Sequence, residues 1–385
     1  MPLTTSRRLL RHSAAALAFA ALSGCSMFSN HNPKYDPVPL TEYPAAISAA
    51  VSWSVPVGSG GGYGFAPMVV QDTVFAATPD GKVVSANVST GQIRWQTALS
   101  GELSAGVGSD GVTTAVVGIG GTVIALDEQG RERWRTRASS AVNMPPTVGD
   151  GVVVVRTTDY RIQAFDAATG EPRWSVQRPG PALALQTNMR MLSVQGLVIS
   201  GLPNGRLMAI EAATGNVQWE GTVSASYGAT DLERINDVVG TPQIQGPLLC
   251  GVTYQGRIVC FDISRGGMPV WEQPFSSNTG MTSDPQQVYA ATRRDTVYAF
   301  RLDDGTEVWK QAGLANRQLS GPAVLPQAVA FGDLEGYIHF LSRTDGRLLG
   351  RVQVGDDPIV SPLVATPSGF IVQTGEGRLL RVSVN

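Results

Sequence analysis

Residues that could carry out catalysis are few in this chain of 385 residues. Of its three histidines, only His339 lies in the repetitive part of the sequence, at a repeat position that elsewhere holds Ile, Gln, Met or Tyr. We therefore interpret His339 as a packing residue rather than a general base. No ligand spacing typical of a zinc site or a calcium loop is present, and the glycine run Gly58–Gly62 lacks the Lys-Ser/Thr of a phosphate-binding loop. The sequence thus predicts no catalytic residue, no cofactor and no metal.

Cys25 is the residue with the clearest chemistry. Three arginines near the N-terminus precede a short apolar run, Ala14–Leu22, that cannot span a membrane. The following Leu-Ser-Gly-Cys looks like a bacterial lipobox, in which the leader is cut before the cysteine and that cysteine receives lipid. The alternatives are a plain secretory leader with a stray cysteine and, from the paired arginines, export by the twin-arginine route.

We therefore predict a signal peptide over residues 1–24 and several acyl chains on Cys25, which together give a stable membrane anchor. Ser26 replaces the Asp that would suggest retention at the inner membrane, and it favours the inner leaflet of the outer membrane. Residues 25–50 are rich in Pro, Asn and Ser and predict a flexible tether of roughly 70 Å at full extension.

Cys250 and Cys260 leave two interpretations open. Cys260 falls on a repeat position otherwise held by Ser or Ala, so a small buried side chain explains it. The two cysteines also flank a tight turn, and an oxidising compartment permits a disulfide between facing strands.

A repeated hairpin organises the rest of the chain. The segment YRIQAFDAATGEPRW, residues 160–174, has the alternation of two strands around a glycine turn, and gap-free copies occupy residues 81–95, 205–219 and 295–309. Further copies differ by one residue in length or lack the final tryptophan. Six of the seven tryptophans end a copy, and the seventh precedes the first copy: Trp53, Trp95, Trp134, Trp174, Trp219, Trp271 and Trp309.

The period of about 40 residues is typical of a propeller blade of four short strands. Seven copies end between Trp95 and Gly350, and the residues after Gly350 supply most of an eighth blade. The missing strand is present around Trp53, before the first copy. We therefore predict an all-β fold over residues 51–385: an eight-bladed β-propeller of four-stranded antiparallel blades, closed by the N-terminal strand joining the last blade. A buried tryptophan is expected at each blade contact.

Two long connections interrupt this regular scaffold, and binding usually resides in such insertions. They lie within residues 177–190 and 224–240, and the second includes a possible helical turn capped by Thr230. The first contains the apolar pair Leu183 and Leu185, which either contacts a partner or folds under the loop. A formal net charge of −2 does not suggest a nucleic-acid partner.

The AATGxxxW repeats resemble the quinoprotein-dehydrogenase repeat, and together with the lipobox and the closing strand the whole chain resembles the BamB family of outer-membrane assembly lipoproteins. The resemblance implies a scaffold without a cofactor that binds the periplasmic POTRA domains of BamA. The family's docking loops match the two long connections, and its apolar pair matches Leu183 and Leu185. An adjacent family arginine is Gln186 here, and of two expected acids one matches Asp237 while the other is Val239.

The resemblance also implies a location at the periplasmic face of the outer membrane and a second role, binding of unfolded barrel precursors by strand addition. Two other functions stay open from the sequence. A quinoprotein oxidoreductase would need a calcium-bound quinone and a carboxylate base in the ring axis, and a glycan-binding propeller would need neither.

Overall fold

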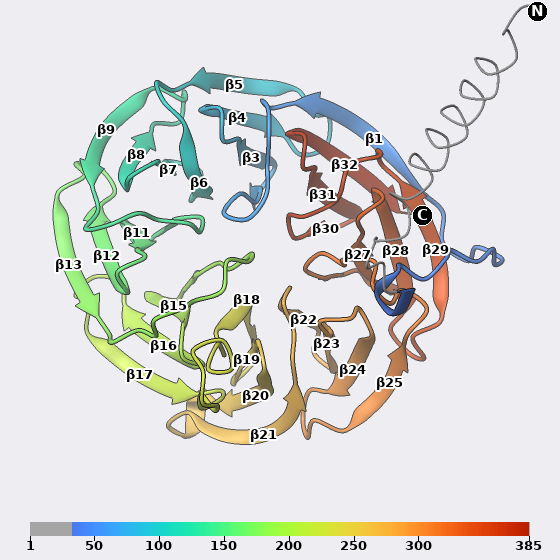
Figure 1. Ribbon diagram of the computed structural model, residues 1–385. Helices are drawn as coiled ribbons and strands as arrows, with labels where there is room; N and C mark the ends of the chain where they lie inside the picture. The colour runs from blue at the N-terminus through green and yellow to red at the C-terminus, as the bar shows by residue number, and fades with distance from the viewer. Residues whose placement is uncertain (1–32, 385) are drawn as a thin grey trace, which may run out of the picture. The chain divides into compact units, whose positions relative to one another are not determined.

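The computed structural model describes residues 33–384, and nearly all of its regular structure is β-strand (Figure 1). From Val38 onward the chain forms one compact unit. The residues before it form a separate unit, of which the described part carries the short 3-10 helix η1 (Pro33–Tyr35). Within residues 33–384, no helix has the length and apolarity needed to cross a membrane.

Eight antiparallel sheets of four strands surround a central axis, each with its first strand innermost and its last strand at the rim (Figure 1). We number the blades 1 to 8 in chain order. Blades 1 and 2 comprise β2 (Met68–Val70), β3 (Thr73–Ala77), β4 (Lys82–Asn87), β5 (Ile93–Ala98), and β6 (Leu103–Ser109), β7 (Thr114–Gly118), β8 (Thr122–Leu126), β9 (Glu132–Arg137). Blades 3 and 4 comprise β10 (Thr147–Gly149), β11 (Val152–Arg156), β12 (Arg161–Asp166), β13 (Pro172–Gln177), and β14 (Leu192–Val194), β15 (Leu197–Leu202), β16 (Arg206–Glu211), β17 (Val217–Thr222).

The second half of the ring repeats this plan. Blades 5 and 6 comprise β18 (Val238–Gln245), β19 (Leu248–Thr253), β20 (Gly256–Asp262), β21 (Met268–Phe275), and β22 (Met281–Ser283), β23 (Gln287–Ala291), β24 (Val297–Arg301), β25 (Glu307–Gln311); the 3-10 helix η2 (Ile263–Arg265) lies in the last turn of blade 5. Blade 7 comprises β26 (Ala323–Val324), β27 (Ala328–Gly332), β28 (Tyr337–Ser342) and β29 (Leu348–Gln353). Blade 8 comprises β30 (Val364–Thr366), β31 (Gly369–Gln373), β32 (Arg378–Val384) and β1 (Ala49–Pro56).

The two ends of the propeller close the ring. Strand β1 pairs antiparallel with β32 from Ala49 opposite Val384 to Pro56 opposite Arg378, so the N-terminal strand is the outer strand of the last blade. Blade 8 is therefore built from strands of both ends of the propeller. The predicted number of blades, their four strands and the closing strand are all confirmed.

Each tryptophan of the repeat packs against the turn glycine of the following blade. A Cβ atom built on any of these glycines would lie within 3.0 Å of the indole of the preceding blade; the pairs are Trp53–Gly91, Trp95–Gly130, Trp134–Gly170, Trp174–Gly215, Trp219–Gly267, Trp271–Gly305 and Trp309–Gly346. In five of the seven pairs the indole Nε1 also donates a hydrogen bond of 2.7–3.0 Å to a carbonyl of the next blade. The repeat therefore conserves a contact between blades and not only a hairpin within one blade.

The contact between blades 7 and 8 is built differently. Blade 8 has no turn between its last two strands, because β32 and β1 are the last and first strands of the described chain. Blade 7 correspondingly has Gly350 at the tryptophan position, and a Cβ there would meet the carbonyl of Ile47. The amides of Ala46 and Ile47 donate to the Leu349 carbonyl at 2.7 and 3.0 Å, and Ile47 is buried. The chain entering β1 thus fills the space that an indole fills elsewhere.

The segment before β1 is bound to the folded body from Val38 onward, so the later part of the predicted tether of residues 25–50 belongs to the propeller unit. The Val38 amide donates to the Ala315 carbonyl at 3.0 Å, and Arg317 Nη1 donates to the Val38 carbonyl at 3.1 Å. Arg351 Nη1 donates to the Thr41 carbonyl at 2.7 Å. Proline and serine composition predicted a free chain, but these backbone groups find partners on the folded body.

His339 is buried beneath this segment. Its Nε2 lies 2.8 Å from Asp333 Oδ2, which also accepts a hydrogen bond from Arg317 Nε at 2.7 Å. Since Arg317 in turn binds the Val38 carbonyl, the histidine belongs to a buried network that fixes the entering chain. The structural role predicted for His339 agrees with this position.

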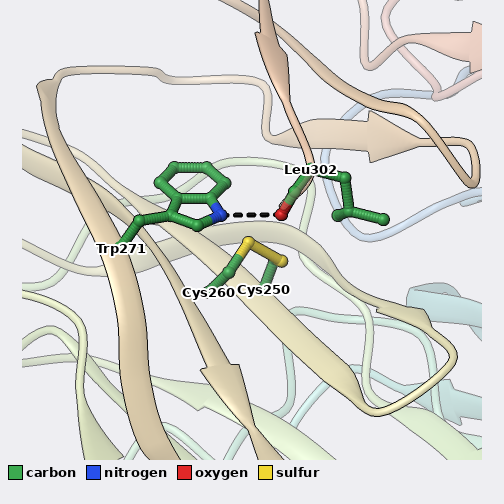
Figure 2. Close-up of a disulfide and its surroundings, with 4 residues drawn as sticks. All are labelled: Cys250, Cys260, Trp271 and Leu302. Carbon is green, nitrogen blue, oxygen red and sulfur yellow. Dashed lines mark hydrogen bonds between the residues drawn. A yellow bond between two sulfur atoms is a disulfide. The ribbon is translucent and has the colours of Figure 1, made fainter. Parts of the chain in front are cut away.

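Cys250 and Cys260 form a disulfide between β19 and β20, where they are directly opposite in the register. Figure 2 shows the disulfide beside Trp271, whose indole donates to the Leu302 carbonyl of blade 6 at 2.7 Å. Closing a loop of about ten residues stabilises a fold by roughly 3 kcal/mol through the unfolded chain. Both interpretations of Cys260 therefore hold: its side chain is small and buried, and it also forms a disulfide with Cys250.

The indole–glycine contact can be tested with two glycines of blade 3. Gly170 and Gly151 have nearly the same φ, 75° and 76°, but only a Cβ at Gly170 would meet Trp134. Gly151→Ala should cost about 1 kcal/mol from backbone strain alone, whereas Gly170→Ala should cost about 2–4 kcal/mol because the indole must also move. Urea unfolding of both variants measures the difference, and equal losses would show that the indole contact adds nothing.

Candidate partner-binding surface

Two neighbouring connections between blades form the candidate surface. Residues 178–191 link β13 to β14, and residues 223–237 link β17 to β18. Both run from the outer strand of one blade to the inner strand of the next, so they lie at the same end of the ring. The Leu185 amide donates a hydrogen bond of 2.5 Å to Asp237 Oδ2, and this bond joins the two connections directly.

The three residues predicted on the first connection differ in exposure. Leu183 is 43% exposed and Gln186 is exposed, so both are available to a partner. Leu185 is half-buried and packs against two apolar clusters, one between blades 3 and 4 and the other between blades 5 and 6. Each interpretation of the apolar pair therefore applies to one residue: Leu183 faces solvent and is available to a partner, whereas Leu185 largely packs under the loop.

Asp237 and Val239, predicted on the second connection, are both buried, at 0% and 2% exposure. Burial raises the pKa of Asp237, while the Leu185 amide and the positive charge of Arg156 act to lower it. Arg156 is itself buried and bonds the Gly201 carbonyl and the Met189 sulfur. We therefore assign Asp237 a positioning role: its carboxylate holds the first connection in place, and it is not exposed for direct contact.

The first connection is anchored at both ends. Tyr160 donates its hydroxyl proton to the Pro181 carbonyl at 2.6 Å. Past Gln186 the chain reaches toward other blades: Thr187 Oγ1 donates to the Asn278 carbonyl at 2.5 Å, and Asn188 Nδ2 donates to the Val360 carbonyl at 2.6 Å. These bonds join the loop to the connections before blades 6 and 8, so Leu183 projects from a fixed segment.

The second connection contains the single turn predicted from Thr230. Glu233 accepts from the amides of Ala229 and Thr230 at 2.8 and 3.0 Å, and Thr230 Oγ1 accepts from the Glu233 amide at 3.3 Å, as in a capping box. The turn is too short to be a helix. It exposes Leu232 at 68%, and Tyr227 precedes it at 69%.

Neither Leu232 nor Tyr227 was singled out from the sequence. The signal available was a pair of large apolar residues within a polar insertion, the same signal that identified Leu183.

The ring axis holds a separate cavity of about 430 Å³. Its lining contains no Asp or Glu, and within residues 33–384 no group of three or more His, Cys, Asp or Glu could hold a metal ion. A calcium-bound quinone requires carboxylate oxygens at the metal and a carboxylate base beside the quinone. The residues of this axis do not fit such a group.

Comparison with known proteins adds the family. A model described as "Outer membrane protein assembly factor BamB" matches residues 45–104 and 98–311. A protein of that name from Bordetella pertussis is 55% identical and covers 98% of each chain, and one from Burkholderia pseudomallei is 37% identical and covers 94% of each. The chain belongs to the BamB family. This confirms the resemblance inferred from the repeats, the lipobox and the closing strand.

Solved structures show how widely the fold is used. The crystal structure of BamB from Moraxella catarrhalis superposes with a TM-score of 0.79 at 23% identity, covering 87% of this chain and 100% of that one. A europium-containing methanol dehydrogenase superposes with a TM-score of 0.69 at 14% identity, covering 87% and 93%. At such identities both comparisons concern the fold alone, which this chain shares with that dehydrogenase as well.

The buried carboxylate of Asp237 predicts a measurable pH dependence. Its pKa is raised above the usual 3.8 in the folded chain, so the folded state binds this proton more tightly than the unfolded state. The protonated side chain of Asp237 therefore adds to the free energy of unfolding below pH 3.8, and this contribution is lost as the pH rises through the raised pKa.

Urea unfolding from about pH 3.5 to 7 should therefore show wild type losing stability relative to Asp237→Asn, which cannot titrate. Because every other acid is common to both proteins, a difference that stays constant with pH would contradict this assignment.

Proposed function

We propose that this chain is a non-enzymatic scaffold that assists the assembly of β-barrel proteins into the outer membrane by binding the POTRA domains of BamA. One observation carries the proposal: in a member of the BamB family, the hydrogen bond from Leu185 to Asp237 joins two long connections and leaves Leu183 projecting from them. The curated relatives named above are called outer membrane protein assembly factors.

The contact is apolar at its centre. Leu183 and Gln186 lie on the first connection, and we add Leu232 and Tyr227 of the second to the surface. Fully burying one leucine contributes about 1.5–3 kcal/mol, and little of this is offset by ordering a loop that is already anchored. The lost family charges at Gln186 and Val239 are consistent with a contact that depends more on these apolar side chains.

Unfolded barrel precursors are a second proposed partner. The rim strands of the ring have an unpaired edge, and a precursor could add a strand there by backbone hydrogen bonding. Strand β21 is the favoured edge, since it is eight residues long and exposes Met268 and Val270. An extended segment placed beside it would cover both side chains.

We further propose that lipid on Cys25 attaches the scaffold to the inner leaflet of the outer membrane, on its periplasmic side. Cys25 lies outside the described residues, as does the signal peptide of residues 1–24. Because the folded body begins at Val38, twelve residues separate it from Cys25, and this stretch of chain reaches at most about 45 Å. The scaffold would therefore stay closer to the membrane than a tether ending at residue 50 allows.

The other functions considered from the sequence have less support. The axial lining lacks the acids of a calcium–quinone centre, and no observation favours glycan binding. Scaffolding needs no bond-breaking residue, in keeping with the structural role of His339.

Leu183→Asp tests the surface with little risk to the fold, since the side chain is exposed. Co-purification with BamA from detergent-solubilised outer membranes should fall by at least about tenfold, because a charge replaces an apolar anchor. Val112→Asp is the matched control: Val112 is 50% exposed on blade 2, and this variant should co-purify normally. Undiminished co-purification of Leu183→Asp would remove this residue from the surface. Adding Leu185→Asp should complete the loss, although it also disturbs the packing beneath the loop.

Cys25→Ser tests the anchor. Without the cysteine thiol no acyl chain can be attached, so Cys25→Ser should be lost from the outer-membrane fraction, and mass spectrometry of wild type should find acyl chains on Cys25. Ser23→Ala, which leaves the cysteine in place, is the control. Retention of Cys25→Ser in the outer-membrane fraction of cells lacking BamA would contradict lipid anchoring.

A further inference from the structure

The axial cavity carries one charged side chain, Arg190, among otherwise uncharged lining residues. Its volume of about 430 Å³ lies within the range of small-molecule sites in proteins. Apolar side chains from several blades form much of its wall, including Met68, Met281 and Leu363. A cavity of this composition offers apolar contact and one positive charge.

Arg190 reaches across the axis from the connection before blade 4. Its Nη2 donates to the carbonyls of Ala66, Pro67 and Val107, at 3.0, 3.4 and 3.3 Å. Its Nη1 donates to the Met68 sulfur at 3.0 Å, and a thioether is a weak acceptor. All of these acceptors are neutral.

Among the described residues no carboxylate lies within ion-pair distance of Arg190, in contrast to Arg317 and Arg343. Arg317 pairs with Asp333 at 2.7 Å, and Arg343 pairs with Asp284 at 2.5 Å.

Buried Arg156 likewise bonds only neutral acceptors, but it lies near the charge of Asp237. Burial lowers the pKa of Arg190 to about 10, so it remains protonated at neutral pH. Arg190 is half-buried, and a partly desolvated cation without a carboxylate partner is stabilised by an anion that reaches it.

Two hydroxyls in the same lining point to a ligand independently. Ser283 is only 8% exposed, and neither its Oγ nor the Oγ1 of Thr279 has a hydrogen-bond partner. Buried hydroxyls are normally paired. Both oxygens are closed to solvent, so each side chain must rotate about χ1 before its hydroxyl can donate to an anionic oxygen in the cavity. The cavity therefore combines an arginine that lacks a counter-ion with donors that lack acceptors.

We propose that the axial cavity binds a small organic monocarboxylate. The carboxylate takes the place of the Met68 sulfur at Arg190 and accepts from the hydroxyls of Ser283 or Thr279, while the apolar body of the ligand packs against Met281 and Leu363. A single positive charge in an uncharged lining matches one negative charge better than the double charge of a phosphate. This site is independent of the partner-binding surface and of the proposed scaffold function.

Isothermal titration of the purified full chain with phenylacetate, at constant ionic strength, tests the proposal. Phenylacetamide, which has nearly the same shape but no charge, is the matched ligand control and should bind at least about tenfold more weakly. Arg190→Met should abolish phenylacetate binding, whereas Arg94→Met, at an exposed ion pair on blade 1, should not change it.

A second variant tests the site without changing Arg190, in case Arg190→Met does not fold. Ser283→Ala with Thr279→Val removes both hydroxyls without leaving a buried charge, and it should weaken phenylacetate binding several-fold while Leu183→Asp leaves it unchanged. The proposal is overturned if phenylacetate shows no saturable binding up to about 10 mM, if phenylacetamide binds equally well, or if folded Arg190→Met binds like wild type.

Discussion

The contact between an indole and a glycine of the next blade is the constraint on which this ring depends. A blade of four short strands cannot bury its faces alone, so its stability comes from its neighbours. The indole of one blade packs against a turn residue of the next blade. That residue must be a glycine because even a methyl group would overlap the indole ring, as Trp134 and Gly170 illustrate. The same glycine also adopts a positive φ that closes the turn. One residue thus shapes a hairpin and receives the preceding blade.

The place where this contact is absent explains how the ring is completed. Blade 7 has Gly350 where the other blades have tryptophan, since the closing blade offers no turn glycine to receive an indole. The entering chain around Ile47 occupies the space instead, and the buried network of Arg317, Asp333 and His339 holds the segment that leads to it. Closure therefore rests on strand pairing and on a docked N-terminal segment together. The same docking shortens the stretch of chain between the folded body and Cys25.

A closed ring gives its connections fixed positions. The first long connection is bound to Asp237 of the second and, through Thr187 and Asn188, to connections before distant blades. Its exposed apolar residue is consequently presented without a large loss of loop entropy on binding. The same segment carries Arg190 to the axis, where a calcium-bound quinone would need acids that this lining lacks. The connection from β13 to β14 thus contributes an apolar side chain, Leu183, to the partner-binding surface and a charged side chain, Arg190, to the axial cavity.

The sequence by itself determined the architecture, because the repeat is local and periodic: tryptophan and glycine recur in register, and a missing strand at one end is matched by a spare strand at the other. It also identified Leu183, since an apolar residue in an insertion is visible without knowing its neighbours.

Only the tertiary structure decided that Asp237 is buried beneath that loop, that residues 38–47 are docked, that Cys250 and Cys260 are joined, and that Arg190 faces the axis without a carboxylate. Each of these depends on residues from different segments or blades meeting in the closed ring. Such contacts cannot be recognised from a repeat in the sequence, because each is made only once and not in every blade.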